Sequence, residues 1–197
     1  GGEGAKLEQD LARRTKELGI RVVGPNCLGL LDTHTKLNAS FAPGMPSPGK
    51  IAFFSQSGAL GTAVLDWAIK ENIGFSKFIS MGNKMDVNED DLLTVLADDP
   101  DTNVILGYIE GVKDGKAFMQ AALEATKKKP VVIVKSGTTA AGAKAASSHT
   151  GTLAGSDNAF QSAFKQCGII RAQTIESLFD YALVLAYQAL PKNNRLA

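Results

Sequence analysis

One histidine in this chain has surroundings that suit chemistry at neutral pH. His149 stands in the run Ser-Ser-His-Thr-Gly-Thr-Leu-Ala-Gly, at the end of a long stretch of small residues. An imidazole changes charge near neutrality, so a neutral ring nitrogen is available as a base, a nucleophile or a metal ligand. Metal ligation is disfavoured because no second His or Cys lies at ligand spacing. By itself, His149 could equally be a loop or capping residue, and His34 is expected on the surface.

A short polar turn is the second candidate. Ser55, Gln56, Ser57 and Gly58 follow an apolar strand and lead directly into a helical pattern. The free N–H groups and the positive dipole end of such a helix suit a phosphate. The alternative is an ordinary N-cap formed by Ser55 or Ser57. Neither a GxxxxGK[ST] motif nor a GxGxxG motif is present. Gly151, after the histidine, leaves room for close approach to a ligand.

A carboxylate at the end of a strand is the third candidate. Glu110 follows the apolar run 104–109 and precedes Gly111. In doubly wound folds, ligands collect at the carboxyl ends of the strands. A carboxylate there could accept a hydrogen bond from an imidazole and stabilise its charge. A solvated loop glutamate is the alternative.

The elements that must position these residues follow a regular pattern. Apolar, strand-like runs alternate with amphipathic helical patterns, which is typical of a parallel sheet covered by helices on both faces. Residues 50–190 contain five such units, so we expect an α/β, flavodoxin-like, doubly wound parallel sheet of five strands. The expected strands are 51–54, 75–79, 104–109, 131–134 and 169–170.

The remaining segments are too small to fold alone. Residues 1–26 contain one helical pattern and one strand-like run, Ile20 to Val23, and we expect them to be the end of a preceding α/β domain. Residues 27–49 are rich in Pro and Gly and are interpreted as a connector. Residues 191–197 are interpreted as a linker. The start without Met suggests a piece of a longer protein.

Composition narrows the class of protein. The 197 residues are 44% hydrophobic and 21% charged, which suits a globular protein with a proper core. Lys plus Arg number 21 and Asp plus Glu number 20, so the charge balance favours neither nucleic acid nor a membrane surface. No membrane span or signal peptide is evident, and a cytoplasmic location is expected. The two cysteines are far apart, and Cys167 is expected in the core.

A series of motifs, taken together and in order, resembles a known family. They are Gly24-Pro25-Asn26, Ser55-Gln56-Ser57-Gly58, Ser80-Met81-Gly82-Asn83, Glu110 and Ser148-His149-Thr150-Gly151. This arrangement is similar to the ADP-forming acyl-CoA synthetases, relatives of the succinyl-CoA synthetase α subunit. The resemblance covers essentially the whole chain. It corresponds to the flavodoxin-like second domain, preceded by the end of a CoA-binding Rossmann domain.

The resemblance implies a mechanism and assigns residues to it. In that family, acyl-CoA reacts with phosphate to give an acyl phosphate, whose phosphoryl group moves to a histidine and then to ADP. His149 matches the phosphohistidine, and Glu110 matches the glutamate that holds the imidazole. Residues 55–58 match the helix start that cradles phosphate. Asn26 corresponds to a residue near the thioester end of coenzyme A.

The resemblance also implies partners. Coenzyme A would be a substrate, while ADP or ATP and Mg would be bound by parts absent from this chain. Those parts are an ATP-grasp domain or β subunit, most of the CoA-binding domain and a second flavodoxin-like domain. We therefore expect an oligomeric full-length ligase and an inactive isolated domain. The acyl group, the choice of ADP or GDP, and a one-chain or two-subunit architecture stay open.

Two other classes of function are possible. Protein lysine acetyltransferases carry a related regulatory domain without synthetase chemistry, and its histidine motif is typically degenerate. The intact motif here favours the enzyme. A plain flavodoxin-like signalling domain would need an acidic phosphoacceptor cluster at strand ends, whereas Asp98 and Asp99 follow a helical pattern.

Overall fold

The structure of the protein is a computed structural model that describes residues 2–138 and 156–189. Its strands are β1 (Gly29–Asp32), β2 (Leu37–Ser40), β3 (Pro48–Ser55), β4 (Phe75–Ser80), β5 (Val104–Ile109), β6 (Val131–Lys135) and β7 (Ile170–Ala172). Its helices are α1 (Gly2–Glu17), α2 (Gly58–Lys70), α3 (Glu89–Asp98), α4 (Gly115–Lys128), α6 (Asp157–Cys167) and α7 (Ile175–Tyr187). Within these residues, no helix is long and apolar enough to cross a membrane.

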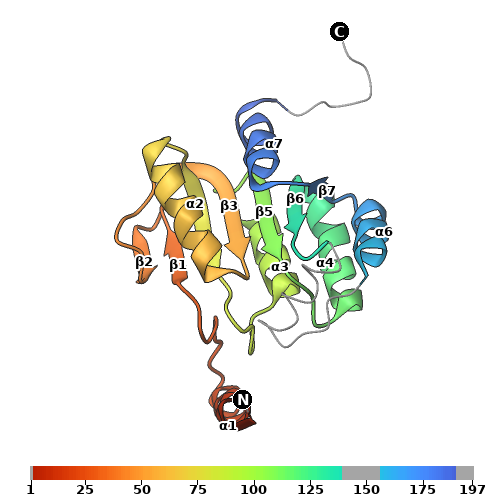
Figure 1. The fold of residues 1–197 in the computed structure, drawn as a ribbon. Helices are drawn as coiled ribbons and strands as arrows, with labels where there is room; N and C mark the ends of the chain where they lie inside the picture. The colour runs from red at the N-terminus through yellow and green to blue at the C-terminus, as the bar shows by residue number, and fades with distance from the viewer. Residues whose placement is uncertain (1, 139–155, 190–197) are drawn as a thin grey trace.

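The expected parallel sheet is present. Five strands pair in parallel in the order β4-β3-β5-β6-β7 (Figure 1). This is the flavodoxin-like order, because the first parallel strand lies between the second and the third. The chain direction across the sheet therefore reverses between β3 and β5. In this fold ligands bind outside the carboxyl ends of the strands at that point.

Two further strands extend the sheet beyond this expectation. β1 and β2 form an antiparallel hairpin, and β1 also pairs antiparallel with β4, which makes the whole sheet seven-stranded and mixed. The hairpin lies within residues 27–49, which we interpreted as a connector. Its pattern was weak because only Leu31 of β1 is fully buried and most of β2 is exposed. A short edge strand of this kind carries little apolar signal.

The prediction of a strand at Ile20 to Val23 was wrong. No strand is assigned there. The backbone of Val22 is paired instead with the segment after β4: its N–H donates to the Asp86 carboxylate at 2.7 Å, and its C=O accepts from Val87 at 3.2 Å. A local apolar run cannot specify strand formation when its partner is an irregular loop.

The core lies on both faces of the sheet. Along β3, Ile51 and Phe53 pack toward α2 and α7, whereas Ala52 and Phe54 pack toward α3, α4 and α6. This alternation follows from the two-residue period of a strand, and burial on both faces explains the continuous apolar run. Cys167 is buried in the second cluster, as expected.

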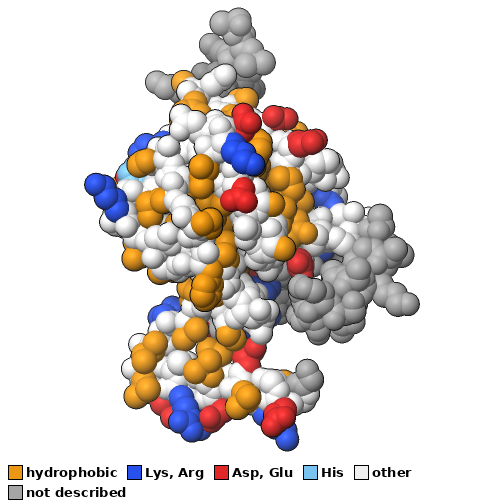
Figure 2. Space-filling view, turned by 60° about the vertical axis from the view of Figure 1, so that its left-hand side comes forward, with side chains coloured by type: hydrophobic (Ala, Val, Ile, Leu, Met, Phe, Trp, Pro, Cys, Tyr) orange, Lys and Arg blue, Asp and Glu red, His pale blue; other side chains and the backbone are white. Residues whose placement is uncertain are grey.

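Helix α1 stands apart from this core. It has no buried residue, its Leu7 and Leu11 are 68% and 42% exposed, and Leu18 just after it is 72% exposed. Figure 2 shows hydrophobic side chains among charged ones at the bottom of the molecule, where Figure 1 places α1. Its assignment to a preceding domain remains a prediction.

The segment before β1 is held at the carboxyl edge of the sheet by the loop after β4. The N–H of Asn83 donates to Pro25 O at 2.9 Å, and the N–H of Met85 donates to Gly24 O at 2.9 Å. Gly82 has a φ of +58°, and a Cβ built on it would lie 2.2 Å from Pro25 O. The tertiary fold thus brings together the Gly-Pro-Asn and Ser-Met-Gly-Asn motifs.

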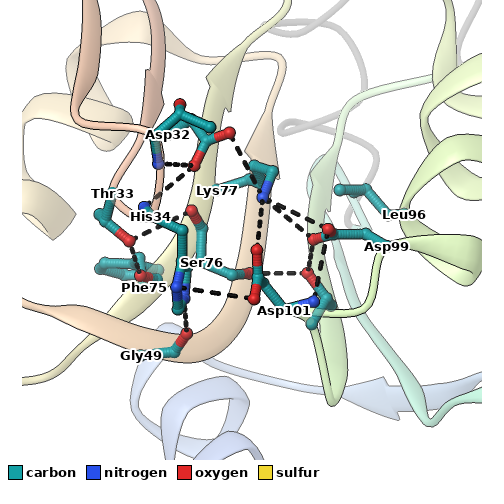
Figure 3. Close-up of polar contacts among 12 residues, drawn as sticks. Asp32, Thr33, His34, Gly49, Phe75, Ser76, Lys77, Leu96, Asp99 and Asp101 are labelled. Atoms are coloured by element: carbon teal, nitrogen blue, oxygen red, sulfur yellow. Dashed lines mark hydrogen bonds and ion pairs between the residues drawn. The ribbon is translucent and has the colours of Figure 1, made fainter.

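The opposite, amino edge carries a charged cluster (Figure 3). The Lys77 ammonium lies 3.5 Å from Asp32, 3.2 Å from Asp99 and 3.9 Å from Asp101. His34 is exposed as expected, and its Nδ1 lies 3.6 Å from Asp101. Lys77 thus joins the hairpin, β4 and the segment before β5.

We expect Lys77→Met to destabilise the fold in a pH-dependent way. Burial alone would raise the pKa of Asp99, but hydrogen bonds from Thr102 and Lys77 outweigh it and lower that pKa. A carboxylate with a lowered folded-state pKa contributes stability above its unfolded pKa, and this stability is lost as the pH falls through the folded pKa. Urea unfolding should show a loss of about 1–3 kcal/mol at pH 7.

The same substitution should cost much less near pH 3, because Asp99 begins to be protonated in the unfolded state and its contribution declines. Lys70→Met, at an exposed position on α2, is the matched control and should change little at either pH. An equal loss from Lys77→Met at both pH values would contradict the assigned role.

We expect Gly82→Ala to destabilise the protein by about 1–3 kcal/mol, because the side chain meets Pro25 O and the positive φ is strained. Thermal unfolding measures the loss. Gly115→Ala is the control, since a Cβ there has nothing within 4 Å. Equal stability of both variants would show that the contact of Gly82 with Pro25 is unimportant.

Candidate functional site

The ends of β3 and β5 meet at the point where the strand order reverses. Ser55 pairs with Tyr108 in the parallel register, and the N–H of Gln56 donates to Tyr108 O at 3.1 Å. Glu110 follows β5 directly. The turn after β3 and the carboxylate after β5, which lie 54 residues apart in sequence, are therefore neighbours.

The Glu110 carboxylate has an unusual environment. Its Oε2 is buried and has no hydrogen-bond partner among the described residues. The same holds for the Oγ of Ser136, the residue after β6, whose N–H donates to Ile109 O at 2.9 Å. Buried polar atoms are nearly always paired because leaving them unpaired costs free energy. Two such atoms at neighbouring strand ends indicate a place where a further polar group binds.

The turn after β3 is closed by its own hydrogen bonds. Ser57 is the N-cap of α2, since its Oγ accepts from Leu60 N–H at 3.3 Å. Ser55 Oγ donates to Ser57 O at 2.8 Å and accepts from Ser57 N–H at 3.1 Å. The capping alternative is thus confirmed for Ser57.

The N–H groups still available to an anion lie in the first turn of α2. Those of Gln56 and Ser57 are used internally, whereas no described residue accepts from the N–H of Gly58 or Ala59. Gly58 is also open, since a Cβ there would come no closer than 3.8 Å to another atom. Backbone N–H groups at a helix start favour negative charge.

The Gln56 side chain is engaged by the Glu110 loop. Its Oε1 accepts from the N–H of Glu110 at 2.7 Å and of Gly111 at 3.2 Å. Its Nε2 donates to Gly111 O at 2.8 Å and to the Glu89 carboxylate. The sequence reasoning placed Gln56 with the phosphate group, but the structure uses its whole amide between β3, β5 and α3.

A buried ion pair lies next to this amide, and the sequence reasoning missed it. Lys84 and Glu89 are 6% and 1% exposed, and Lys84 Nζ lies 2.5 Å from Glu89 Oε1. Lys84 Nζ also donates to Gly111 O at 2.8 Å, and Lys113 donates to Lys84 O. The sequence carries no local signal for the pair, because polar residues stand next to both Lys84 and Glu89 in the chain.

Lys135 is a second residue that the sequence reasoning missed. It ends β6, is 4% exposed, and its ammonium lies 4.9 Å from the centre of the Phe160 ring and donates to Ser136 O. Burial lowers the pKa of Lys135, Arg171 acts in the same direction, and the carboxylates of Asp157 and Glu110 oppose them. A lysine ending a buried β-branched strand was the available signal.

The other predicted site residues are distributed as follows. Asn26 has a φ of +55°, and its Nδ2 donates to Asn83 Oδ1 at 3.3 Å, so it lies at the same carboxyl edge. His149 and Gly151 lie outside the described residues. Among the residues that the structure describes, no group of three or more His, Cys, Asp or Glu is arranged to hold a metal.

Comparisons with known proteins agree with this architecture. A family model for the succinyl-CoA ligase like flavodoxin domain matches residues 48–185. The ADP-forming acetate–CoA ligase I of Archaeoglobus fulgidus is 51% identical over 94% of this chain. The α subunit of the ADP-forming acetate–CoA ligase I of Pyrococcus furiosus is 48% identical over 100% of it. The Ca. Korarchaeum cryptofilum dinucleotide forming acetyl-coenzyme A synthetase 1, solved with phosphate and ADP, superposes over 96% of this chain with a TM-score of 0.92 and 43% identity.

The chain spans only part of these relatives. It covers 27% of the Archaeoglobus protein, 42% of the Pyrococcus subunit and 41% of the Korarchaeum chain. The match of the family model covers all five parallel strands and includes Gln56, Glu110 and the start of α2. The chain therefore belongs to the family of succinyl-CoA ligase-like flavodoxin domains.

Proposed function

We propose that this chain is the phosphohistidine-carrying domain of an ADP-forming acid–CoA ligase. The full reaction converts acyl-CoA, phosphate and ADP into acid, coenzyme A and ATP, through an acyl phosphate and a phosphohistidine. Relatives named as ADP-forming acetate–CoA ligases and a 4-hydroxybutyrate–CoA ligase of Nitrosopumilus maritimus, 46% identical, support this class of reaction.

The buried, unpaired Oε2 of Glu110 is the observation that carries the proposal. It lies beside the start of α2, where the strand order reverses, and has no hydrogen-bond partner among the described residues. A carboxylate oxygen in that state is suited to accept a hydrogen bond from an imidazole N–H. The sequence supplies one histidine in an intact family motif, His149.

His149 and Glu110 have separate roles in the proposed phosphoryl transfer. One ring nitrogen of His149 attacks the phosphorus of the acyl phosphate, and the carboxylate leaves as the acid. Glu110 accepts a hydrogen bond from the other ring nitrogen, which fixes the tautomer and stabilises positive charge on the ring. ADP then attacks the phosphohistidine, which forms ATP and regenerates the imidazole.

The phosphoryl group needs donors that balance its charge. The N–H groups of Gly58 and Ala59 at the start of α2 supply such donors. Within the motif at residues 55–58, Ser55 and Ser57 shape the turn. Gly151 is a further proposed phosphate contact, on the basis of the sequence resemblance.

Other parts of the enzyme complete the reaction in this proposal. Asn26 lies at the edge where coenzyme A would approach, while a CoA-binding domain and a second flavodoxin-like domain supply further contacts. ADP or ATP and Mg are assigned to an ATP-grasp domain or β subunit on the family resemblance. The relatives' greater length and the name "subunit alpha" support such additional parts.

The first test is phosphorylation of the complete ligase. With ATP and magnesium, we expect an acid-labile, base-stable phosphoryl adduct that is lost in His149→Ala, because the proposal makes His149 the phosphoryl acceptor. His34→Ala, at an exposed position, should keep it. An adduct that persists in His149→Ala would falsify the central assignment, and no adduct in the unmodified protein would favour a regulatory domain.

The second test addresses Glu110. Glu110→Gln should fold normally but slow phosphorylation by about 10²-fold or more, because the neutral amide stabilises the charged ring poorly. Rapid-quench measurement of adduct formation gives the rate. Glu124→Gln, exposed on α4, is the matched control. Unchanged kinetics in Glu110→Gln would remove this carboxylate from the mechanism.

A further inference from the structure

We infer that Gln56, with the buried Lys84–Glu89 pair, forms a clamp that positions Glu110. In this inference Gln56 is a positioning residue and not a phosphate ligand. Its mechanistic meaning rests on the proposed function, because Glu110 is the residue that it serves. The contacts themselves depend on the fold alone.

The first support is the number and kind of contacts that Gln56 makes. Its amide bonds three backbone groups of two consecutive residues: the N–H of Glu110, the N–H of Gly111 and the C=O of Gly111. The amide orientation follows from chemistry, because Oε1 faces two donors and Nε2 faces two acceptors. A flipped amide would set oxygen against oxygen.

The second support is the ion pair behind the amide. Glu89, the first residue of α3, accepts from both Gln56 Nε2 and Lys84 Nζ. Lys84 Nζ also donates to Gly111 O, so this carbonyl accepts from both Lys84 and Gln56. Glu89 thereby favours the amide orientation in which Nε2 donates to Gly111 O and Oε1 accepts from the N–H groups of Glu110 and Gly111.

The desolvation cost of the buried Lys84–Glu89 pair favours a role in positioning over a role in stability. Burying two charges costs several kcal/mol of desolvation, so a buried pair is weak evidence for stability alone. Here Lys84 bonds Gly111 O directly, one residue beyond Glu110, and Glu89 acts on the same peptide through the Gln56 amide. A main chain held in this way can present an unpaired, buried Oε2 without the side chain having to anchor itself. The clamp therefore preorganises the carboxylate before the imidazole arrives.

The decisive experiment is a double-mutant cycle in the complete ligase. Gln56→Ala should slow phosphorylation by about 10–100-fold, a range typical of residues that orient a reacting group through another. Adding Gln56→Ala to Glu110→Gln should cause less than a threefold further loss, because both changes disable one carboxylate. Losses that multiply would show that Gln56 acts independently of Glu110 and would overturn the inference.

The separate effects on kcat and on KM distinguish a positioning role of Gln56 from phosphate binding. In the direction that consumes phosphate, Gln56→Ala should lower kcat and leave the KM for phosphate unchanged, whereas a phosphate ligand would raise that KM. Gln166→Ala, exposed on α6, is the control. If Gln56→Ala folds poorly, Gln56→Asn, whose shorter amide cannot span the same contacts, replaces it with the same expectations.

A structural readout distinguishes failure of the clamp from failure of the proposed function. Amide hydrogen exchange at Glu110 and Gly111 should accelerate at least tenfold in Gln56→Ala, because the acceptor of both N–H groups is removed. Unchanged exchange would overturn the clamp. Accelerated exchange together with unaffected Glu110→Gln kinetics would instead retain the clamp and reject the role of Glu110.

Discussion

The pairing of β3 with both β4 and β5 is the interaction on which the rest of the structure depends. β3 is the central strand of the seven-stranded sheet, and Ile51 to Ser55 are buried. α2, which follows β3, packs on one face of the sheet, and α4, which follows β5, packs on the other, so the chain leaves these two strand ends in opposite directions. The carboxyl ends of β3 and β5 consequently meet without a helix crossing between them, which leaves that edge available for Gln56, Glu110 and the start of α2.

The carboxyl and amino edges of the sheet differ in how far their polar groups have hydrogen-bond or ionic partners. At the amino edge, Lys77 is surrounded by carboxylates and links neighbouring segments, which is a structural role. At the carboxyl edge, Gln56 makes a hydrogen bond with every polar atom of its amide, while the Oε2 of Glu110 has no partner among the described residues. Rigid support beneath an unpaired acceptor is what preorganised chemistry requires.

Particular residues show how far sequence reasoning reached. The five parallel strands were predicted because burial on both faces produces continuous apolar runs. The hairpin at 29–40 was missed because its two strands bury only Leu31 fully and so carry little apolar signal. A local pattern offered an N-cap by Ser55 or Ser57 as one alternative, whereas the partners of Gln56 lie 33, 54 and 55 residues away in sequence. Side-chain bonds over such separations leave no periodic pattern.

The sequence by itself determined the fold class, the position of Glu110 at a strand end and the helix start after β3. These features arise from local hydrophobic periodicity and capping, which act between residues close in the chain. Only the tertiary structure decided that the Gln56 amide supports the Glu110 loop and that Lys84 and Glu89 are buried as a pair. Those outcomes depend on which loops meet at one edge of the sheet, and strand order, set by long-range packing, decides that.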